Sequence, residues 1–312
     1  MASARDVQEI YGGTISMNRN TLMLLGFLAV LIVIAYLVMQ KPGEKSSTGE
    51  GEYLISVDSL AVDRVEIKSP ASHVVLVKKG VEWFMERPVA YRADQGSVAQ
   101  LIHEMKLLER KSTVSGKPEK HSVFQVDSTG TQVTTYETGS EKASFVIGKM
   151  GGSYLESYGR LASSNEVLLV SGGSPMTFNK AVKEWRDRTI AAPARETIRD
   201  VRYQYGDTVF VLAFTDSAWM VGKDSTQEWV VNNLISTLTN VQADDFIDAP
   251  AVRSSKPSAQ ITYAGTQITF FYVKEGDKYL VQCSSTPQWF EMQSWRANQI
   301  LKRKSDIIKN VR

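Results

Sequence analysis

The longest apolar stretch of the chain runs from Thr21 to Met39 and contains no charged residue. A helix rises about 1.5 Å per residue, so a helix over this stretch crosses the roughly 30 Å hydrocarbon core of a bilayer. A cleaved signal peptide is the alternative. Its apolar region is shorter, about 7–15 residues, and no small-x-small cleavage pattern follows Met39. The pattern therefore predicts one transmembrane helix over residues 21–39.

Polar segments flank this apolar stretch on both sides. Residues 1–20 are expected to form a short cytoplasmic tail, whose natural start is left open between Met1 and Met17. Residues 40–53 are rich in glycine, serine, lysine and glutamate, a composition typical of a flexible linker. The flanking positive charges are balanced and give no orientation, but a long domain translocates regardless of charge. We expect a single-pass protein of the inner membrane with its C-terminal region outside the cytoplasm.

Apolar positions alternate along short segments of the region after residue 53. Such alternation predicts strands with one buried face. In the first half these cover Val62–Lys68, Val74–Lys78, Glu82–Met85, Gln132–Tyr136, Ala143–Ile147, Ser153–Ser157 and Val167–Val170. In the second half they cover Val201–Gln204, Thr208–Phe214, Ala218–Val221, Ser258–Tyr263, Gln267–Val273 and Tyr279–Gln282. Strand hairpins with a few helices favour an α+β fold, with antiparallel sheets and helices packed on one face.

Apolar residues recur at three- and four-residue spacing in two other segments. This periodicity predicts amphipathic helices over Ser97–Glu109 and Thr226–Val241, the second with Ser225 as its N-cap. Each half is also expected to close with a helical stretch, over Pro175–Trp185 and Pro287–Lys304.

The two halves resemble each other in sequence. Val62–Ile67 matches Ile198–Tyr203, and the same spacing places Trp83 on Trp219. Further matches follow in the same order: Leu101, Ile102, Met105 and Leu108 with Leu234, Ile235, Leu238 and Val241; Phe145 and Tyr154 with Phe270 and Tyr279; Trp185-Arg186 with Trp295-Arg296. A colinear series of this kind indicates an internal repeat. We predict two similar lobes, residues 54–190 and residues 195–304.

Motifs that carry chemistry are missing from the sequence. It has no phosphate-binding glycine loop, no GxSxG elbow and no HExxH. Its histidines, His73, His103 and His121, are scattered, and Cys283 is its single cysteine, so neither a zinc site nor an intrachain disulfide is expected. A net charge of +2 does not indicate a nucleic-acid partner. We expect no enzymatic activity, no cofactor and no metal.

Four side chains are candidates for a binding role. Trp185 and Arg186, with their later counterparts Trp295 and Arg296, combine the residue types that are enriched at interface hot spots. We predict a contact with a protein partner at these positions, and packing at the junction of the lobes is the alternative. The glycines of 148–152 and 171–175 are expected in turns, with Pro175 as a first helical residue. Asp244, Asp245 and Asp248 lack the spacing of a calcium loop, which favours a solvated turn.

Several of these segments together resemble a bacterial family of membrane-anchored proteins, the domain-of-unknown-function family number 4340 (DUF4340). They are Val81–Pro88, Arg92-Ala93-Asp94, Met105–Glu109, Phe145–Gly148 and Trp185–Arg188. The chain departs from the family's pattern at 121–124, where members often carry Tyr-Gly-Leu. The resemblance implies no known catalysis. It implies an extracytoplasmic accessory subunit, because such proteins are often encoded beside ABC-transporter components of the gliding-motility type.

Two functions stay open at this point. The first is a membrane-tethered accessory or scaffold protein that binds a membrane or envelope protein partner. The second is a module that binds a small molecule, glycan or peptide in the cleft between the lobes, because ligand sites favour such interfaces.

Overall fold

The computed structural model describes residues 20, 23, 26–33, 52–248 and 256–309. The chain divides into two compact units, residues 1–52 and residues 53–312. In the first unit, Met23 and residues 26–33 are helical with exposed side chains; the remainder of the predicted span 21–39, and most of the predicted tail and linker, lie outside the described residues. None of the helices in the described part of the chain is long and apolar enough to cross a membrane.

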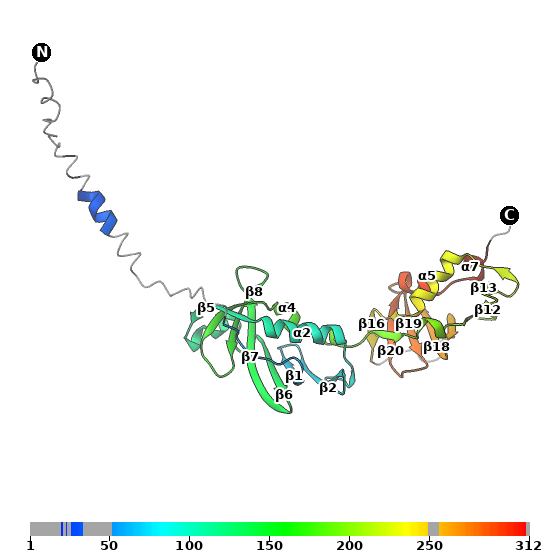
Figure 1. Ribbon diagram of the computed structural model, residues 1–312, viewed down its shortest axis with the longest axis horizontal. Coiled ribbons are helices and arrows are strands. Elements are labelled where there is room, and N and C mark those ends of the chain that lie inside the picture. Colours follow the sequence, from blue (N-terminus) through cyan, green and yellow to red (C-terminus); the bar gives the residue numbers. More distant parts are fainter. Residues whose placement is uncertain (1–19, 21–22, 24–25, 34–51, 249–255, 310–312) are drawn as a thin grey trace, which may run out of the picture. The chain divides into compact units, whose positions relative to one another are not determined.

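The second unit begins with a nine-stranded antiparallel sheet of order β4-β3-β2-β1-β6-β7-β8-β9-β5. Its strands are β1 (Val62–Lys68), β2 (His73–Lys79), β3 (Glu82–Arg87), β4 (Tyr91–Arg92), β5 (Glu109–Ser115), β6 (Thr131–Glu137), β7 (Ser140–Met150), β8 (Glu156–Leu161) and β9 (Val167–Ser171). Its helices are α2 (Gln95–Leu107), η1 (Pro118–Lys120), α3 (His121–Phe124), α4 (Pro175–Phe178) and η2 (Val182–Trp185). We call this sheet with its helices the first lobe (Figure 1).

A second nine-stranded antiparallel sheet follows, with the order β14-β13-β12-β11-β17-β18-β19-β20-β16. Its strands are β11 (Asp200–Tyr205), β12 (Thr208–Thr215), β13 (Ala218–Val221), β14 (Asp224–Ser225), β16 (Asp245–Ile247), β17 (Ala259–Tyr263), β18 (Thr266–Val273), β19 (Lys278–Cys283) and β20 (Trp289–Gln293). With η3 (Arg195–Thr197), α5 (Glu228–Leu238), α6 (Ser294–Ile300) and α7 (Lys304–Ile307) it forms the second lobe. A two-stranded sheet pairs β10 (Thr189–Ala191) with β15 (Val241–Gln242).

The two sheets therefore have the same strand order, and main-chain hydrogen bonds fix which residues are equivalent. Asp94 N donates to Trp185 O at 2.8 Å in the first lobe, and Gln227 N donates to Ile307 O at 2.8 Å in the second. Asp187 N donates to Arg92 O in the same way as Lys309 N donates to Ser225 O, both at 2.9 Å. Arg92 pairs with Phe84, and Ser225 with Met220, at the matching sheet edge.

This bond pattern confirms some of the residue matches read from the sequence and replaces others. Trp83 and Trp219 are each the second residue of equivalent strands, β3 and β13. The structural equivalent of Trp185, however, is Ile307 and not Trp295. Tyr154 lies outside the strands, whereas Tyr279 lies in β19, so this match is wrong as well.

The amphipathic helices bury the predicted stripe. In α2, Val98, Leu101, Ile102 and Met105 pack in the core of the first lobe, and Asp94 caps the helix by accepting from Ser97 N at 2.6 Å. The α5 helix buries the equivalent residues of the second lobe. Its predicted cap was wrong, because Ser225 lies in β14 and Gln227 precedes the helix without a side-chain cap.

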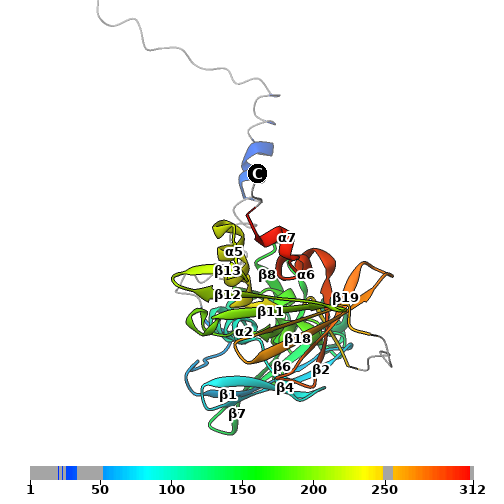
Figure 2. The same ribbon diagram turned by 90° about the vertical axis from the view of Figure 1, so that its right-hand side faces the viewer.

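Helices cover one face of the second sheet and both faces of the first. Residues of α5, α6 and α7 share one core cluster, and Figure 2 shows these helices gathered over the same side of the second sheet. In the first lobe, Phe145 packs with α2 and α4, but its neighbour Val146 packs on Phe124 and Val126. Successive strand residues point to opposite faces, so α3 covers the face that α2 leaves open.

The segment around α3 approaches β7 so closely that position 148 must be a glycine. A Cβ on Gly148 would lie 2.2 Å from Phe124 O, closer than any side chain tolerates. Gly148 lies inside β7, whereas the sequence analysis expected it in a turn. The turn follows at 151–155. The strand β8 accordingly begins at Glu156, later than predicted. In contrast, Pro175 is the first residue of α4, as predicted.

Candidate functional site

Arg186 lies at the joint between the lobes. It is 3% exposed, and its guanidinium carbon is 3.8 Å from the ring centroid of Phe246 and 4.7 Å from that of Tyr91. Its Nη1 donates to Asp248 Oδ1 at 2.9 Å and its Nη2 to Gln288 Oε1 at 2.8 Å. Arg186 of the first lobe thus contacts Phe246, Asp248 and Gln288 of the second lobe.

An ion pair reinforces the same joint. Lys183 Nζ donates to Asp245 Oδ2 at 2.7 Å. Burial acts to raise the pKa of Asp245, but the hydrogen bonds from Lys183 and from the Phe246 amide outweigh it, so that the pKa is lowered. The hydrogen bond to Asp245 raises the pKa of Lys183. Both groups therefore keep their charges more firmly than free side chains do.

The residues predicted to contact a partner divide into two groups. Trp185 is fully buried in the core of the first lobe, and Arg186 is almost fully buried at the joint, where the alternative placed both residues. Trp295 is 59% exposed on α6, and Arg296 stacks on it while binding Asp244 Oδ1 at 2.9 Å. The partner contact stays a prediction, and its surface-accessible members are on the second lobe.

The aspartates 244, 245 and 248 do not converge on a metal. Each binds a different cation, Arg296, Lys183 and Arg186 respectively. Within the described ranges, no group of three or more histidine, cysteine, aspartate or glutamate residues could hold a metal ion. These acids therefore join helices and lobes, a role that the predicted solvated turn did not include.

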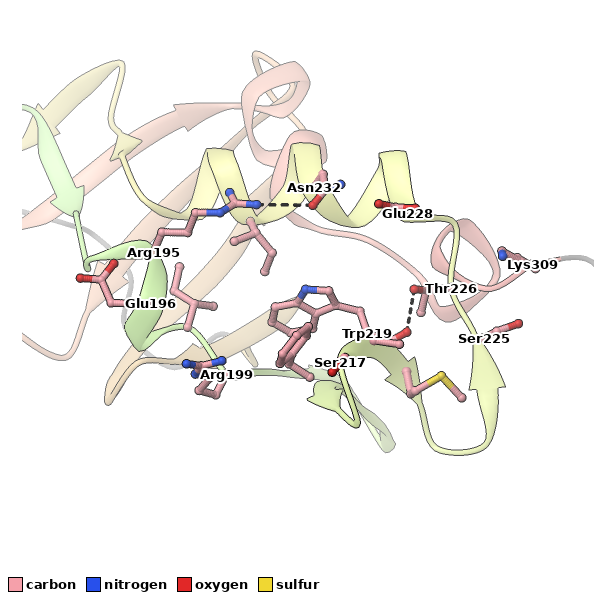
Figure 3. Close-up of a pocket in the computed structure, with 15 residues that line it drawn as sticks. Arg195, Glu196, Arg199, Ser217, Trp219, Ser225, Thr226, Glu228, Asn232 and Lys309 are labelled. Carbon is pink, nitrogen blue, oxygen red and sulfur yellow. Dashed lines mark hydrogen bonds between the residues drawn. The ribbon is translucent and has the colours of Figure 1, made fainter.

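A cavity of about 670 Å³ lies in the second lobe, between η3, β13 and the start of α5. The indole of Trp219 points into it from β13 (Figure 3), and Phe214 lies beside the indole with ring centroids 5.5 Å apart. Thr226 Oγ1 donates to Trp219 O at 2.8 Å and fixes the main chain there. We call this cavity the Trp219 pocket.

Charged side chains surround the indole. Arg195, Arg199 and Lys309 are positive, and Glu196 and Glu228 are negative. Across the described part of the chain, none of these five takes part in an ion pair. Arg195 Nη2 makes a long bond of 3.4 Å to Asn232 Oδ1, and Arg199 stacks 5.7 Å from the ring of Phe214. The pocket thus offers charged hydrogen-bond donors beside the aromatic rings of Trp219 and Phe214, which we call its aromatic floor.

The equivalent place in the first lobe is closed by the chain itself. There Arg92 binds both Glu82, at 2.8 Å, and Asp187. The residues at the equivalent positions of the second lobe are Ser225, Ala218 and Lys309. These three residues cannot form the ion-pair triad in the second lobe, where Lys309 takes the place of the acid Asp187.

The hydrogen bonds to the main chain of the tryptophan also differ between the two lobes. Gln95 clamps Trp83 by accepting from its N at 2.8 Å and donating to its O at 2.9 Å, and Trp83 is only 7% exposed. The equivalent of Gln95 is Glu228, which cannot donate, and Trp219 is only partly buried. In the second lobe the side chain of Thr226 bonds the main chain of the tryptophan, the triad has no counterpart within the described ranges, and Trp219 lines a pocket.

The sequence analysis did not identify this site, although part of its signal was visible. The alignment that placed Trp83 on Trp219 also placed Asp63 on Arg199, a reversal of charge beside the tryptophan. Lys309 lay beyond the predicted end of the second repeat at residue 304, so its replacement of Asp187 could not be seen.

Comparison with known proteins gives one finding. A family model described as domain of unknown function (DUF4340) matches residues 83–260, which is more than half of the chain and includes parts of both lobes and the joint between them. No curated protein and no solved structure matches the chain.

Proposed function

The chain belongs to the DUF4340 family, and from that premise we propose that it is a membrane-tethered extracytoplasmic accessory protein that binds a protein partner through the Trp219 pocket. The observation that carries the proposal is the combination of an aromatic floor with three positive side chains that have no ion-pair partner among the described residues. Tryptophan and arginine dominate the energetics of protein interfaces. An ABC-transporter complex in the envelope is the partner assembly that we propose.

The tether rests on the apolar stretch 21–39. Within it, the described helical residues Phe27, Leu28 and Ile32 are each more than half exposed. Exposed contiguous apolar surface of this kind is costly in water and is covered in a bilayer. A single-pass anchor in the inner membrane, with residues 53–312 outside the cytoplasm, accounts for it.

We also propose that the two lobes arose by duplication. Two sheets of nine strands with one order, and equivalent hydrogen bonds at both sheet edges, support a common origin. The lobes now differ at this edge, which carries the Arg92 triad in the first lobe and an open pocket in the second.

The alternative of a ligand in the cleft between the lobes has less support. A cavity of about 450 Å³ does lie at the joint, lined by Tyr91 and Arg92 from the first lobe and by Thr266 and Ser285 from the second. Its arginine is already bound to two carboxylates. We therefore place the binding site at Trp219.

Anchoring predicts a clear result in membrane fractionation. The full chain should stay in the pellet after carbonate washing of cell membranes, because the apolar stretch remains in the bilayer. Deleting residues 21–39 should move it to the supernatant, whereas deleting residues 43–50 of the polar linker should not. Release of the full chain by carbonate would contradict the tether.

Partner binding predicts an effect of Trp219→Ala on copurification from mild detergent. A buried tryptophan hot spot contributes at least about 2 kcal/mol, or roughly thirtyfold in affinity, so the partner recovered with the full chain should be lost from this variant. Trp229→Ala, a 68% exposed tryptophan on α5 outside the pocket, is the matched control and should retain it. Equal recovery with both variants, or recovery of the chain alone, would rule out the proposal.

A further inference from the structure

We propose, building on the function above, that the Trp219 pocket receives an acidic peptide segment of the partner, whose carboxylates are bound by Arg195, Arg199 and Lys309. The pocket would then obtain from the partner the acid groups that the first lobe supplies from its own chain.

The cations stand at both ends of the indole. Figure 3 shows the Trp219 ring pointing from β13 toward the end where Arg195 and Arg199 lie, with Lys309 at the other end beyond Thr226. A guanidinium has five N–H donors, yet among the described residues the side chains of Arg195 and Arg199 donate only the long bond from Arg195 to Asn232. Carboxylates accept two such donors at once, which makes them the matching group.

The first lobe shows which chemistry satisfies this position. The charged residues of the first lobe that are equivalent to the pocket lining are Asp63, Glu82, Asp187, Arg92 and Lys78, with a sum of −1. The five charged side chains of the Trp219 pocket sum to +1. In the first lobe the carboxylates of Glu82 and Asp187 surround a cation. In the second lobe Ser225 replaces that cation and Ala218 replaces Glu82, while Lys309 takes the place of the acid Asp187.

The acids that the pocket retains favour a peptide over a uniform polyanion. Glu196 lies at the end near Arg195, and Glu228 lies at the end near Thr226 (Figure 3). A phosphate cluster or an anionic lipid surface would place negative charge against both carboxylates, which costs free energy. An extended peptide instead presents acidic side chains at alternate positions and small residues between them, which can rest on Trp219 and Phe214.

Titration of the intact chain in detergent tests this inference, with Trp219 fluorescence as one readout and calorimetry as the other. The probe is an acetylated, amidated peptide of alternating glutamate and alanine, and the control is the same peptide with glutamine in place of glutamate. We expect the acidic peptide to bind at least about tenfold more tightly, since hydrogen bonds to charged groups are about twice as strong as neutral ones. Affinity should fall as salt rises.

Two variants assign the effect to the pocket. Arg195→Gln with Arg199→Gln should weaken the acidic peptide about tenfold or more and leave the glutamine peptide unchanged. Ala218→Glu with Lys309→Asp, which restores the acids of the first lobe, should abolish the preference while the melting temperature stays near that of the parent. Arg202→Gln, a change on β11 outside the pocket lining, is the matched control and should bind as the parent does.

The outcomes separate this inference from the proposed function. Equal binding of both peptides, or inorganic phosphate and anionic vesicles competing as well as the acidic peptide, would overturn the inference. If the partner still copurified in a Trp219-dependent way, the proposed function would stand without it. If no partner copurified but the acidic preference were present and lost in the arginine double variant, the ligand class would stand and the protein-partner function would fall.

Discussion

Replacing Trp185 by alanine is expected to lower the free energy of unfolding by about 3–5 kcal/mol, the range for removal of a large buried aromatic side chain. Trp185 has no exposed surface, and its main-chain oxygen accepts from Asp94 N at the start of α2. Truncation leaves a cavity in the core of the first lobe, next to Lys180, whose ammonium lies 5.3 Å from the ring centroid. Chemical denaturation followed by circular dichroism measures the loss.

Trp295→Ala is the matched control for this experiment. Trp295 is 59% exposed and lies on α6 of the second lobe, so its truncation should change the unfolding free energy by less than about 1 kcal/mol. Similar losses for the two variants would mean that the core of the first lobe does not depend on Trp185 as the structure indicates.

Replacing Arg186 by alanine is expected to cost about 2–4 kcal/mol, through the loss of stacking between Tyr91 and Phe246 and of the bond to Gln288. The bond to Asp248 adds little, because Asp248 is 67% exposed and remains hydrated when the partner is removed. Asp248→Ala should therefore cost less than about 1 kcal/mol. Equilibrium unfolding of each variant and of the double variant gives the coupling between the two residues.

Arg188→Ala controls for loss of a positive charge in the same segment. Arg188 is exposed, and its main-chain oxygen accepts from Ala243 N at 2.8 Å, whereas its side chain makes no hydrogen bond or ion pair within the described ranges. Its truncation should leave stability within about 0.5 kcal/mol of the parent. An Arg186 variant that is as stable as the Arg188 variant would show that the joint does not contribute to folding.

Element positions were largely predictable where apolar and polar residues alternate. Val62–Lys68 and Ala218–Val221 are strands with the predicted limits, because one face of each is buried. The strand β5 was missed because Glu109–Ser115 is mostly polar and lies at the sheet edge, where β9 is its neighbouring strand. Pro287–Lys304 was expected to be helical, but Trp289–Gln293 forms β20, paired on both sides by β19 and β16. Pairing of distant segments overrode the local pattern there.

The candidate site was less predictable than the fold. Trp185-Arg186 and Trp295-Arg296 are identical as dipeptides. The hydrogen bonds nevertheless make Ile307 and Ile308 the second-lobe equivalents of Trp185 and Arg186. Identity of short motifs thus led to the wrong equivalence between the two lobes, whereas the partner contact predicted at these positions stays a prediction. The pocket residues Arg195, Trp219 and Lys309 are far apart in the sequence and form no motif.

By itself the sequence determined the α+β class and the helical stripes, because burial of one face imposes a period that can be read locally. Its motifs resembled the family that the family model then matched, and the colinear matches indicated two similar parts. Only the tertiary structure decided which lobe has a pocket. That outcome depends on whether Arg92 or Ser225 occupies the edge strand, and on what lies across from it more than eighty residues later in the chain. Ion pairs between such distant residues leave no local period, so folding alone brings the partners together and shows where they are missing.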